Sequence, residues 1–90
     1  MKPMNKPTIR VGDKVFEAAI SYGKVFEWEI TDIFLENYLS GYKTMFSVKR
    51  KADGIGIVSE KFATDIFYMF ETKKEAEKAL ELFLKENNNA

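Results

Sequence analysis

The sequence predicts an α+β domain, in which an antiparallel sheet of about five strands forms a small SH3-like β-barrel or a bent sheet and is followed by one C-terminal α-helix. Two observations predict this class. Short segments that alternate apolar and polar residues, separated by glycine-containing turns, fill the chain up to residue 70. The last segment instead repeats its apolar residues every three or four positions. A flatter sheet with the helix across one face is the alternative architecture.

Length and composition indicate one domain. The chain has 90 residues, of which 46% are hydrophobic, and this is too short for a second core. We expect a flexible N-terminal arm at residues 1–8, a folded domain at 9–86 and a frayed tail at 87–90. No apolar run is long enough to span a membrane, and the N-terminus is unlike a secretory signal. Together with the absence of cysteine, this predicts a cytoplasmic location.

The strand predictions follow from alternation and from turn residues. The expected strands cover residues 15–20, 25–34, 42–50, 55–62 and 65–70. The second is the clearest, because Phe26, Trp28 and Ile30 alternate with polar residues. A hairpin connection is expected at Ser21–Lys24, and the pair Asp53-Gly54 favours a tight turn before the fourth strand.

The C-terminal helix is predicted by its cap and its apolar stripe. Thr72 is followed three residues later by Glu75, which is the pattern of a capping box. One helix face then carries Ala76, Ala79, Leu80, Phe83 and Leu84.

The segment between the second and third strands reads best as a short helix. Leu35, Tyr38, Leu39 and Tyr42 fall at helical spacing, with Asp32 in the N-cap position and Gly41 in the C-cap position. Two alternatives follow: the stripe packs over the barrel mouth, or it is an exposed protein interface. The second needs a core that is complete without it, formed by Phe16, Phe26, Trp28, Ile30, Phe46, Val48, Ile57 and the C-terminal helix.

The order of motifs resembles a group of small proteins from phages and prophages of Gram-positive bacteria. The stretches that carry the resemblance are "VGDKVFE", "KVFEWEITDI", "GIVSEKF" and "IFYMFETKKEAEKAL". Proteins of that group pair a "GDKVYE"-like opening with a "VFLTKEEAEKAL"-like ending. The resemblance covers roughly residues 11–84 and implies a small β-barrel fold and a viral or mobile-element origin. It carries no catalytic residue.

The composition disfavours an enzyme. The chain has no histidine and no cysteine, so it lacks the usual general base, the thiol nucleophile and the common zinc ligands. We therefore expect no cofactor and no metal. Glu27 and Glu29 share one strand face about 7 Å apart, a spacing that suits acid–base work or a hard cation. A solvated strand face is the favoured interpretation of this pair.

Three function hypotheses result. The first is a non-catalytic binding protein that docks on a host or phage protein, for example an inhibitor of a defence system such as an anti-CRISPR. Its expected docking residues are Leu35, Tyr38, Leu39, Tyr42 and Lys43. The second is a nucleic-acid-binding barrel that uses Lys49, Arg50 and Lys51, with Tyr42 or Phe46 as a stacking face. The third is a self-associating protein, such as a homodimer.

Overall fold

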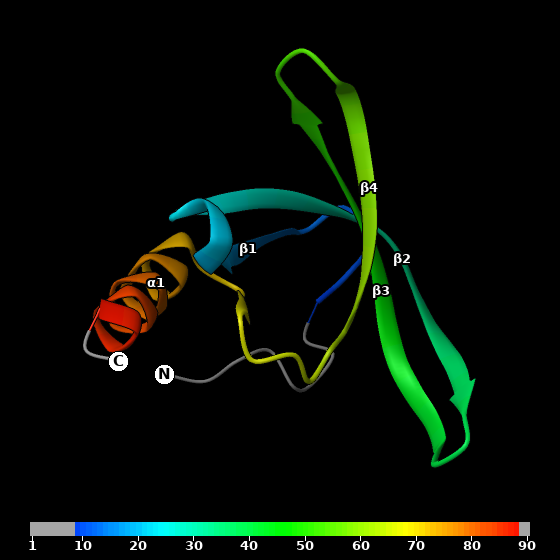
Figure 1. Ribbon diagram of the computed structural model, residues 1–90. Coiled ribbons are helices and arrows are strands. Elements are labelled where there is room, and N and C mark those ends of the chain that lie inside the picture. Colours follow the sequence, from blue (N-terminus) through cyan, green and yellow to red (C-terminus); the bar gives the residue numbers. More distant parts are fainter. Residues whose placement is uncertain (1–8, 89–90) are drawn as a thin grey trace.

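The three-dimensional structure is a computed structural model that describes residues 9–88 (Figure 1). Its elements are strand β1 (Lys14–Ala19), the short 3-10 helix η1 (Ile20–Tyr22), strands β2 (Lys24–Tyr38), β3 (Gly41–Ala52), β4 (Gly56–Ala63) and β5 (Met69–Phe70), and helix α1 (Lys73–Asn88). The flexible N-terminal segment expected at residues 1–8 lies outside the described residues, as do the last two residues of the expected tail. Within residues 9–88, no helix has the length and hydrophobicity that crossing a membrane requires.

The strands form one antiparallel sheet in the order β4-β3-β2-β1-β5, which confirms the five-stranded α+β class with a C-terminal helix. The sheet does not close, so the closed-barrel alternative is wrong and the open, bent sheet is correct. Closure would require pairing between β4 and β5. The expected strand at 65–70 is reduced to two residues, because a turn in which the Ile66 N–H donates to the Ala63 carbonyl precedes it.

The helix expected between the second and third strands does not form. β2 continues to Tyr38 and pairs with β3 as far as Tyr38↔Gly41, where Gly41 adopts a φ of 115°. The backbone groups of this segment therefore bond across to β3 and not along a helix. An isolated helix of fewer than about 12 residues is marginal in water, whereas each residue added to a strand pair gains a partner at once. The helical spacing of the four apolar residues does not reflect a helix, because they lie on β2, in the β2–β3 turn and on β3.

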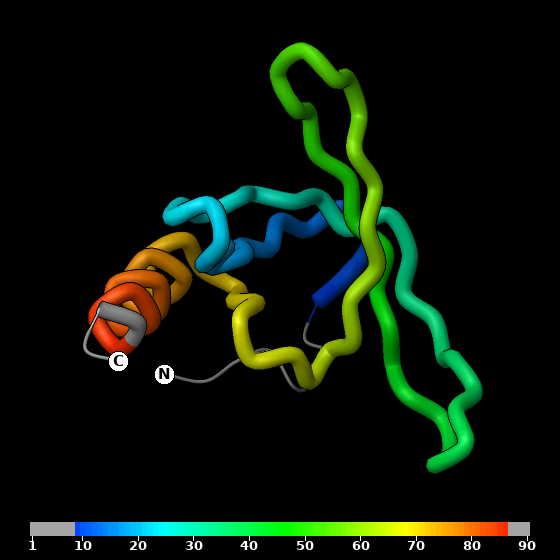
Figure 2. Tube along the Cα trace, viewed as in Figure 1, coloured from blue at the N-terminus to red at the C-terminus, as the bar shows by residue number. Residues whose placement is uncertain are grey.

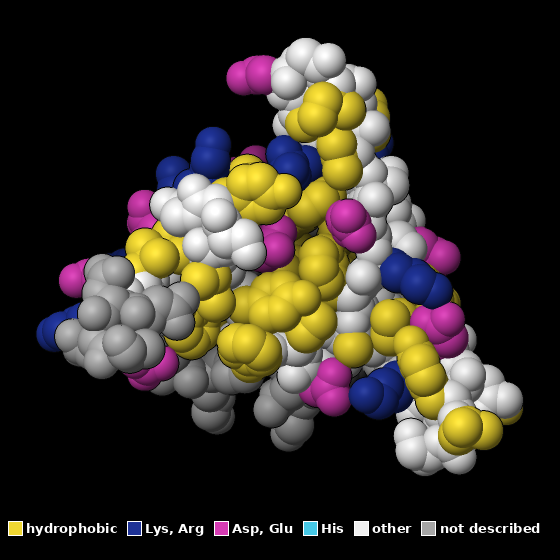
Figure 3. All heavy atoms as spheres, viewed as in Figure 1, with side chains coloured by type: hydrophobic (Ala, Val, Ile, Leu, Met, Phe, Trp, Pro, Cys, Tyr) yellow, Lys and Arg dark blue, Asp and Glu magenta, His cyan; other side chains and the backbone are white. Residues whose placement is uncertain are grey.

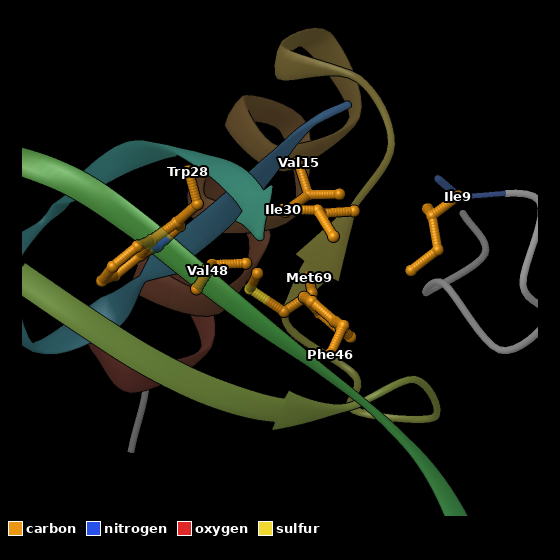
Figure 4. Close-up of a cluster of buried hydrophobic side chains, with 7 residues drawn as sticks. All are labelled: Ile9, Val15, Trp28, Ile30, Phe46, Val48 and Met69. Carbon is orange, nitrogen blue, oxygen red and sulfur yellow. The ribbon is translucent and has the colours of Figure 1, made fainter. Parts of the chain in front are cut away.

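The sheet has two faces, and each holds an apolar cluster. The larger cluster lies on the face that we call the core face and consists of Ile9, Val15, Trp28, Ile30, Phe46, Val48 and Met69 (Figure 4). The second lies on the opposite face, where α1 covers Ala18 and Phe70 with Ala76, Ala79 and Leu80. The predicted helix stripe is thus confirmed. Ile57, expected in the core, is 60% exposed, because it lies on the opposite face beyond the reach of α1.

β3 links two hairpins that point in opposite directions (Figures 1 and 2). At one end β3 pairs with β4 through the expected turn at Asp53-Gly54, in which the Ile55 N–H donates to the Ala52 carbonyl. At the other end it pairs with β2 to form a ribbon, residues 34–45, which we call the arm. β4 reaches only the base of the arm, where Ala63 pairs with Met45, and beyond that point the ribbon has two strands. Between the arm and the body the β2–β3 register shifts at Thr31, which is the pattern of a β-bulge and bends the strand.

Candidate functional site

The arm exposes most of the apolar side chains that the sequence marks as a docking surface. Leu35 is 66% exposed, Tyr42 72%, and Leu39 at the tip is fully exposed, while Tyr38 is 41% exposed. These four residues are therefore not packed in the core, and the alternative in which they close a barrel mouth is wrong. A ribbon of two strands has no inside, so its large apolar residues stay in contact with water.

The strand register divides these residues between two faces. Leu35 lies opposite Thr44, and Tyr42 lies opposite Asn37, both pairs on the side that continues the core face. Tyr38 lies opposite Gly41 and Lys43 opposite Glu36 on the other side. The expected single stripe is therefore two half-surfaces that meet at Leu39. Strand geometry, with its period of two, separates residues that a helix would have placed together.

The side of the arm that carries Tyr38 is held by a small polar network. The Tyr38 hydroxyl donates to Glu36 Oε2 at 3.1 Å, and Lys61 Nζ on β4 donates to Glu36 Oε1 at 2.9 Å. Lys43 Nζ lies 5.6 Å from the Tyr38 ring centroid, within cation–π range. The bond from Lys61 lowers the pKa of Glu36, and Glu36 in turn raises the pKa of Lys61. Desolvation and then the bond to Glu36 raise the pKa of Tyr38.

The expected nucleic-acid cluster is split by the same alternation. Lys49 and Lys51 lie on the opposite face, where Lys49 is directly across from Glu29 in the strand register. Arg50 lies on the core face, with its guanidinium carbon 3.9 Å from the Phe26 ring centroid and 4.9 Å from that of Trp28. Its Nε atom is buried and has no hydrogen-bond partner in the described part of the chain. All three basic residues nevertheless line one depression of the sheet surface. Glu27 and Glu29 line the same depression, so it is not a purely basic phosphate-binding surface.

Arg50 belongs to a groove of about 350 Å³ that sequence reasoning missed. The groove is lined by Glu17, Tyr22, Phe26, Trp28, Arg50, Ile55, Val58, Glu60 and Phe62. Figure 3 shows hydrophobic side chains gathered across the centre of the molecule, with charged side chains at their margins. The indole N–H of Trp28 donates to Glu17 Oε1 at 3.0 Å. Partial burial, together with the charges of Glu17 and Glu60, raises the pKa of nearby Tyr68.

The groove escaped prediction because its residues come from β1, η1, β2, β3, β4 and the turn between β3 and β4. The usable signal was the alternation itself. Phe26 and Trp28 share a face on β2, and Val48 and Arg50 share a face on β3, so one strand-pairing assumption places Arg50 over the two rings.

Glu27 and Glu29 do share a strand face, but Lys14 on β1 lies against both. Its Nζ atom is 4.0 Å from Glu27 Oε2 and 3.5 Å from Glu29 Oε1. The pair lines a depression of about 480 Å³ together with Lys14, Lys49, Arg50, Lys51 and Ile57, so positive and negative groups are mixed there. Among residues 9–88, no group of three or more histidine, cysteine or acidic residues is placed to hold a metal ion. This arrangement is that of a solvated, charge-compensated sheet face.

No protein-family model, no curated protein and no solved structure matches the chain.

Proposed function

We propose that this protein is a non-catalytic binding protein that docks on another protein through its arm. The observation that carries the proposal is the position of Leu35, Leu39 and Tyr42. Leu39 is fully exposed, and Leu35 and Tyr42 are largely exposed, on a hairpin that projects from the body (Figure 1). Burial of leucine and tyrosine side chains against a partner lowers the free energy of the complex. Tyrosine is favoured in this role because few of its rotatable bonds lose their freedom on binding.

The remainder of the arm suits a docking role. The Glu36–Lys61 ion pair and the Tyr38 hydroxyl brace one side of the ribbon, so the tip is presented in a defined position and less order must be imposed on binding. Lys43 adds a charge at the margin of the apolar residues, where charged groups usually steer association.

We further propose that the partner is a host or phage protein in the bacterial cytoplasm, and that binding inhibits an enzyme or a defence system. The support is the resemblance of residues 11–84 to small phage and prophage proteins, together with a sequence without histidine or cysteine. We also propose that the strands have an SH3-like arrangement with the barrel left open, which the succession of short antiparallel strands with close turns supports. An inhibitor of this kind acts by occupying a surface and needs no chemistry of its own.

The test is affinity capture from bacterial lysate with matched surface variants. Leu35→Ser with Leu39→Ser removes the apolar surface of the arm. Val11→Ser with Leu82→Ser removes two exposed apolar residues outside the arm, one in the turn before β1 and one on α1. We expect both variants to keep the unfolding midpoint of the parent chain within a few degrees, because exposed substitutions change stability by about 0.5 kcal/mol or less.

A partner protein that is retained by the parent chain and by the Val11/Leu82 variant, and lost with the Leu35/Leu39 variant, supports the proposal. Equal retention by both variants moves the docking surface elsewhere. A band that disappears after nuclease treatment favours nucleic acid, which the carboxylates of Glu27 and Glu29 beside the basic cluster 49–51 do not favour. The absence of any retained protein contradicts the proposal.

A further inference from the structure

β4 forms a free edge of the sheet. It is the terminal strand in the order β4-β3-β2-β1-β5, and no strand of the described residues lies beyond it. Its register with β3 runs from Ala52↔Gly56 to Met45↔Ala63 without a shift. Proteins usually blunt a free edge with a bulge, a proline, a short strand or charged side chains, lysine above all. β4 runs for eight residues without the first three, and its one lysine, Lys61, is bound to Glu36. The outer backbone groups of β4 therefore have no strand partner among residues 9–88.

The direction of those backbone groups follows from the ladder. The Thr64 N–H donates to the Thr44 carbonyl at 3.0 Å, which places a hydrogen-bonded pair at the end of β4. Hydrogen-bonded and non-hydrogen-bonded pairs alternate along antiparallel strands. Val58, Glu60 and Phe62 therefore bond to β3. The N–H and C=O groups that turn outward are those of Ile57, Ser59, Lys61 and Ala63.

The side chains of β4 leave one charge without a partner. Lys61 on the opposite face is bound to Glu36 at 2.9 Å, so its charge is engaged within the chain. Glu60 lies on the core face, is exposed, and has no ion pair with any described residue. Val58 and Phe62, two positions to either side, line the groove beside it. The edge thus offers a carboxylate between two apolar side chains.

We propose that β4 binds an extended segment of another protein, in which a lysine or arginine lies beside Glu60 and apolar residues lie two positions to either side. The outward backbone groups supply main-chain hydrogen bonds, and alternate side chains of the segment enter the groove and supply specificity. The proposal goes beyond docking through the arm, because it uses another surface and another kind of contact.

Charge determines the chemistry of the segment. Glu17 and Glu60 place two carboxylates in the groove against the single guanidinium of Arg50, which already lies on the Phe26 and Trp28 rings. A basic side chain that enters beside Glu60 gains an opposite charge directly across the strand pair, whereas an acidic one meets a like charge. The volume of about 350 Å³ admits such a side chain and its apolar neighbours.

The test begins with a phage-displayed library of random peptides of about ten residues, long enough to span a typical strand, selected on the immobilised protein. We expect enrichment of a basic residue with apolar residues at positions −2 and +2. Ser59→Pro should lower the affinity of a selected peptide about tenfold, because proline removes an outward N–H while the ladder to β3 stays intact. Glu60→Lys should weaken the basic peptide about threefold to tenfold and strengthen its lysine-to-glutamate counterpart.

Matched controls separate this surface from the arm. The Leu35→Ser/Leu39→Ser variant should bind the selected peptide as the parent chain does, so either proposal can fail alone. N-methylation of alternate peptide amides should abolish binding without any change to the protein, which keeps the test valid if Ser59→Pro does not fold.

Three outcomes overturn the proposal. The first is selection without enrichment over an unselected library. The second is peptide binding that neither Ser59→Pro nor N-methylation weakens. The third is a dimer of the free protein that Ser59→Pro converts to a monomer in sedimentation, because a second copy would then occupy the edge.

Discussion

The guanidinium carbon of Arg50 lies 3.9 Å from the centroid of the Phe26 ring, and this stacking contact ties β3 to β2 on the core face. The Trp28 ring lies 4.9 Å away from the same carbon, so two rings share one cation. The Nε donor of Arg50 is nevertheless buried and without a partner among residues 9–88. A favourable stacking contact and an unfavourable buried donor therefore occur in one side chain.

Substitution of Arg50 should separate these two effects. Arg50→Lys should lower the free energy of unfolding by about 1 kcal/mol, because an ammonium is more strongly hydrated and does not stack on a ring. Arg50→Met keeps the length and apolar area of the side chain and removes the unpartnered donor, so it should change stability by less than about 1 kcal/mol. Urea denaturation followed by the fluorescence of Trp28, the one tryptophan in the chain, measures both. A methionine variant less stable than the lysine variant would contradict this account.

The hydrogen bond from Trp28 to Glu17 should contribute more to the stability of the fold than the negative charge of Glu17 does. The indole N–H lies 3.0 Å from Glu17 Oε1, and Trp28 is only 2% exposed. Glu17→Ala leaves this buried donor without an acceptor and should cost about 1–3 kcal/mol. Glu17→Gln keeps an acceptor oxygen in place and should cost clearly less. Thermal unfolding of the two variants gives the comparison, and equal losses would show that the bond does not stabilise the fold.

The Glu36–Lys61 pair should make the bracing of the arm depend on pH. The pair lowers the pKa of Glu36 below its ordinary value of 4.5, so its contribution is present above that value and is lost as the pH falls through the lower folded-state pKa. The pKa of Lys61 is raised above 10.5, so the contribution is also lost as the pH rises through that higher value. NMR titration of the Glu36 carboxyl carbon measures the first limit. In Lys61→Gln the Glu36 pKa should move back toward 4.5; an unchanged titration would mean that the pair does not form in solution.

The helix and the turns were predictable because their signals are local. The Thr72 hydroxyl accepts the Glu75 N–H at 3.2 Å, as the spacing of the two residues predicts. Gly54 adopts a φ of 79° in the expected turn. Such features depend on residues within one helical turn or one hairpin loop of each other, so the chain need not be folded to recognise them.

The arm and the groove were not predictable in the same way. Leu35, Tyr38 and Leu39 satisfy a helical spacing, and only the pairing with β3 decides in favour of a strand. The groove depends on Arg50 facing Phe26, which requires the register between two strands. Register is a long-range property, and a shift of one residue moves every side chain to the other face. The sequence therefore left open whether the candidate docking residues are exposed or buried, and it did not predict that they lie on two faces of the arm.

The bulge at Thr31 allows the strand register of the arm to be tested by deletion of single residues. Ile30 lies opposite Val48, and Asp32 lies opposite Ser47, so Thr31 is the extra residue between them. Deletion of Thr31 should leave all other pairs as they are, because Ile30, Asp32 and Ile33 then alternate without interruption. The arm should keep its pairing with β3, seen as cross-strand nuclear Overhauser effects between Ile33 and Phe46, and should change its angle to the body.

Deletion of Ile30 is the matched control. It also removes one residue and the bulge, but it moves Thr31 into the core position that Ile30 occupies with 0% exposure. The two deletion variants then differ only in whether isoleucine or threonine fills that position. The free energy of unfolding should be lower in the Ile30 deletion by roughly 2 kcal/mol, the value of burying one large aliphatic side chain. Equal stability of the two variants, or loss of the Ile33–Phe46 contact on deletion of Thr31, would show that the bulge helps to set the register of the arm and does not merely bend it.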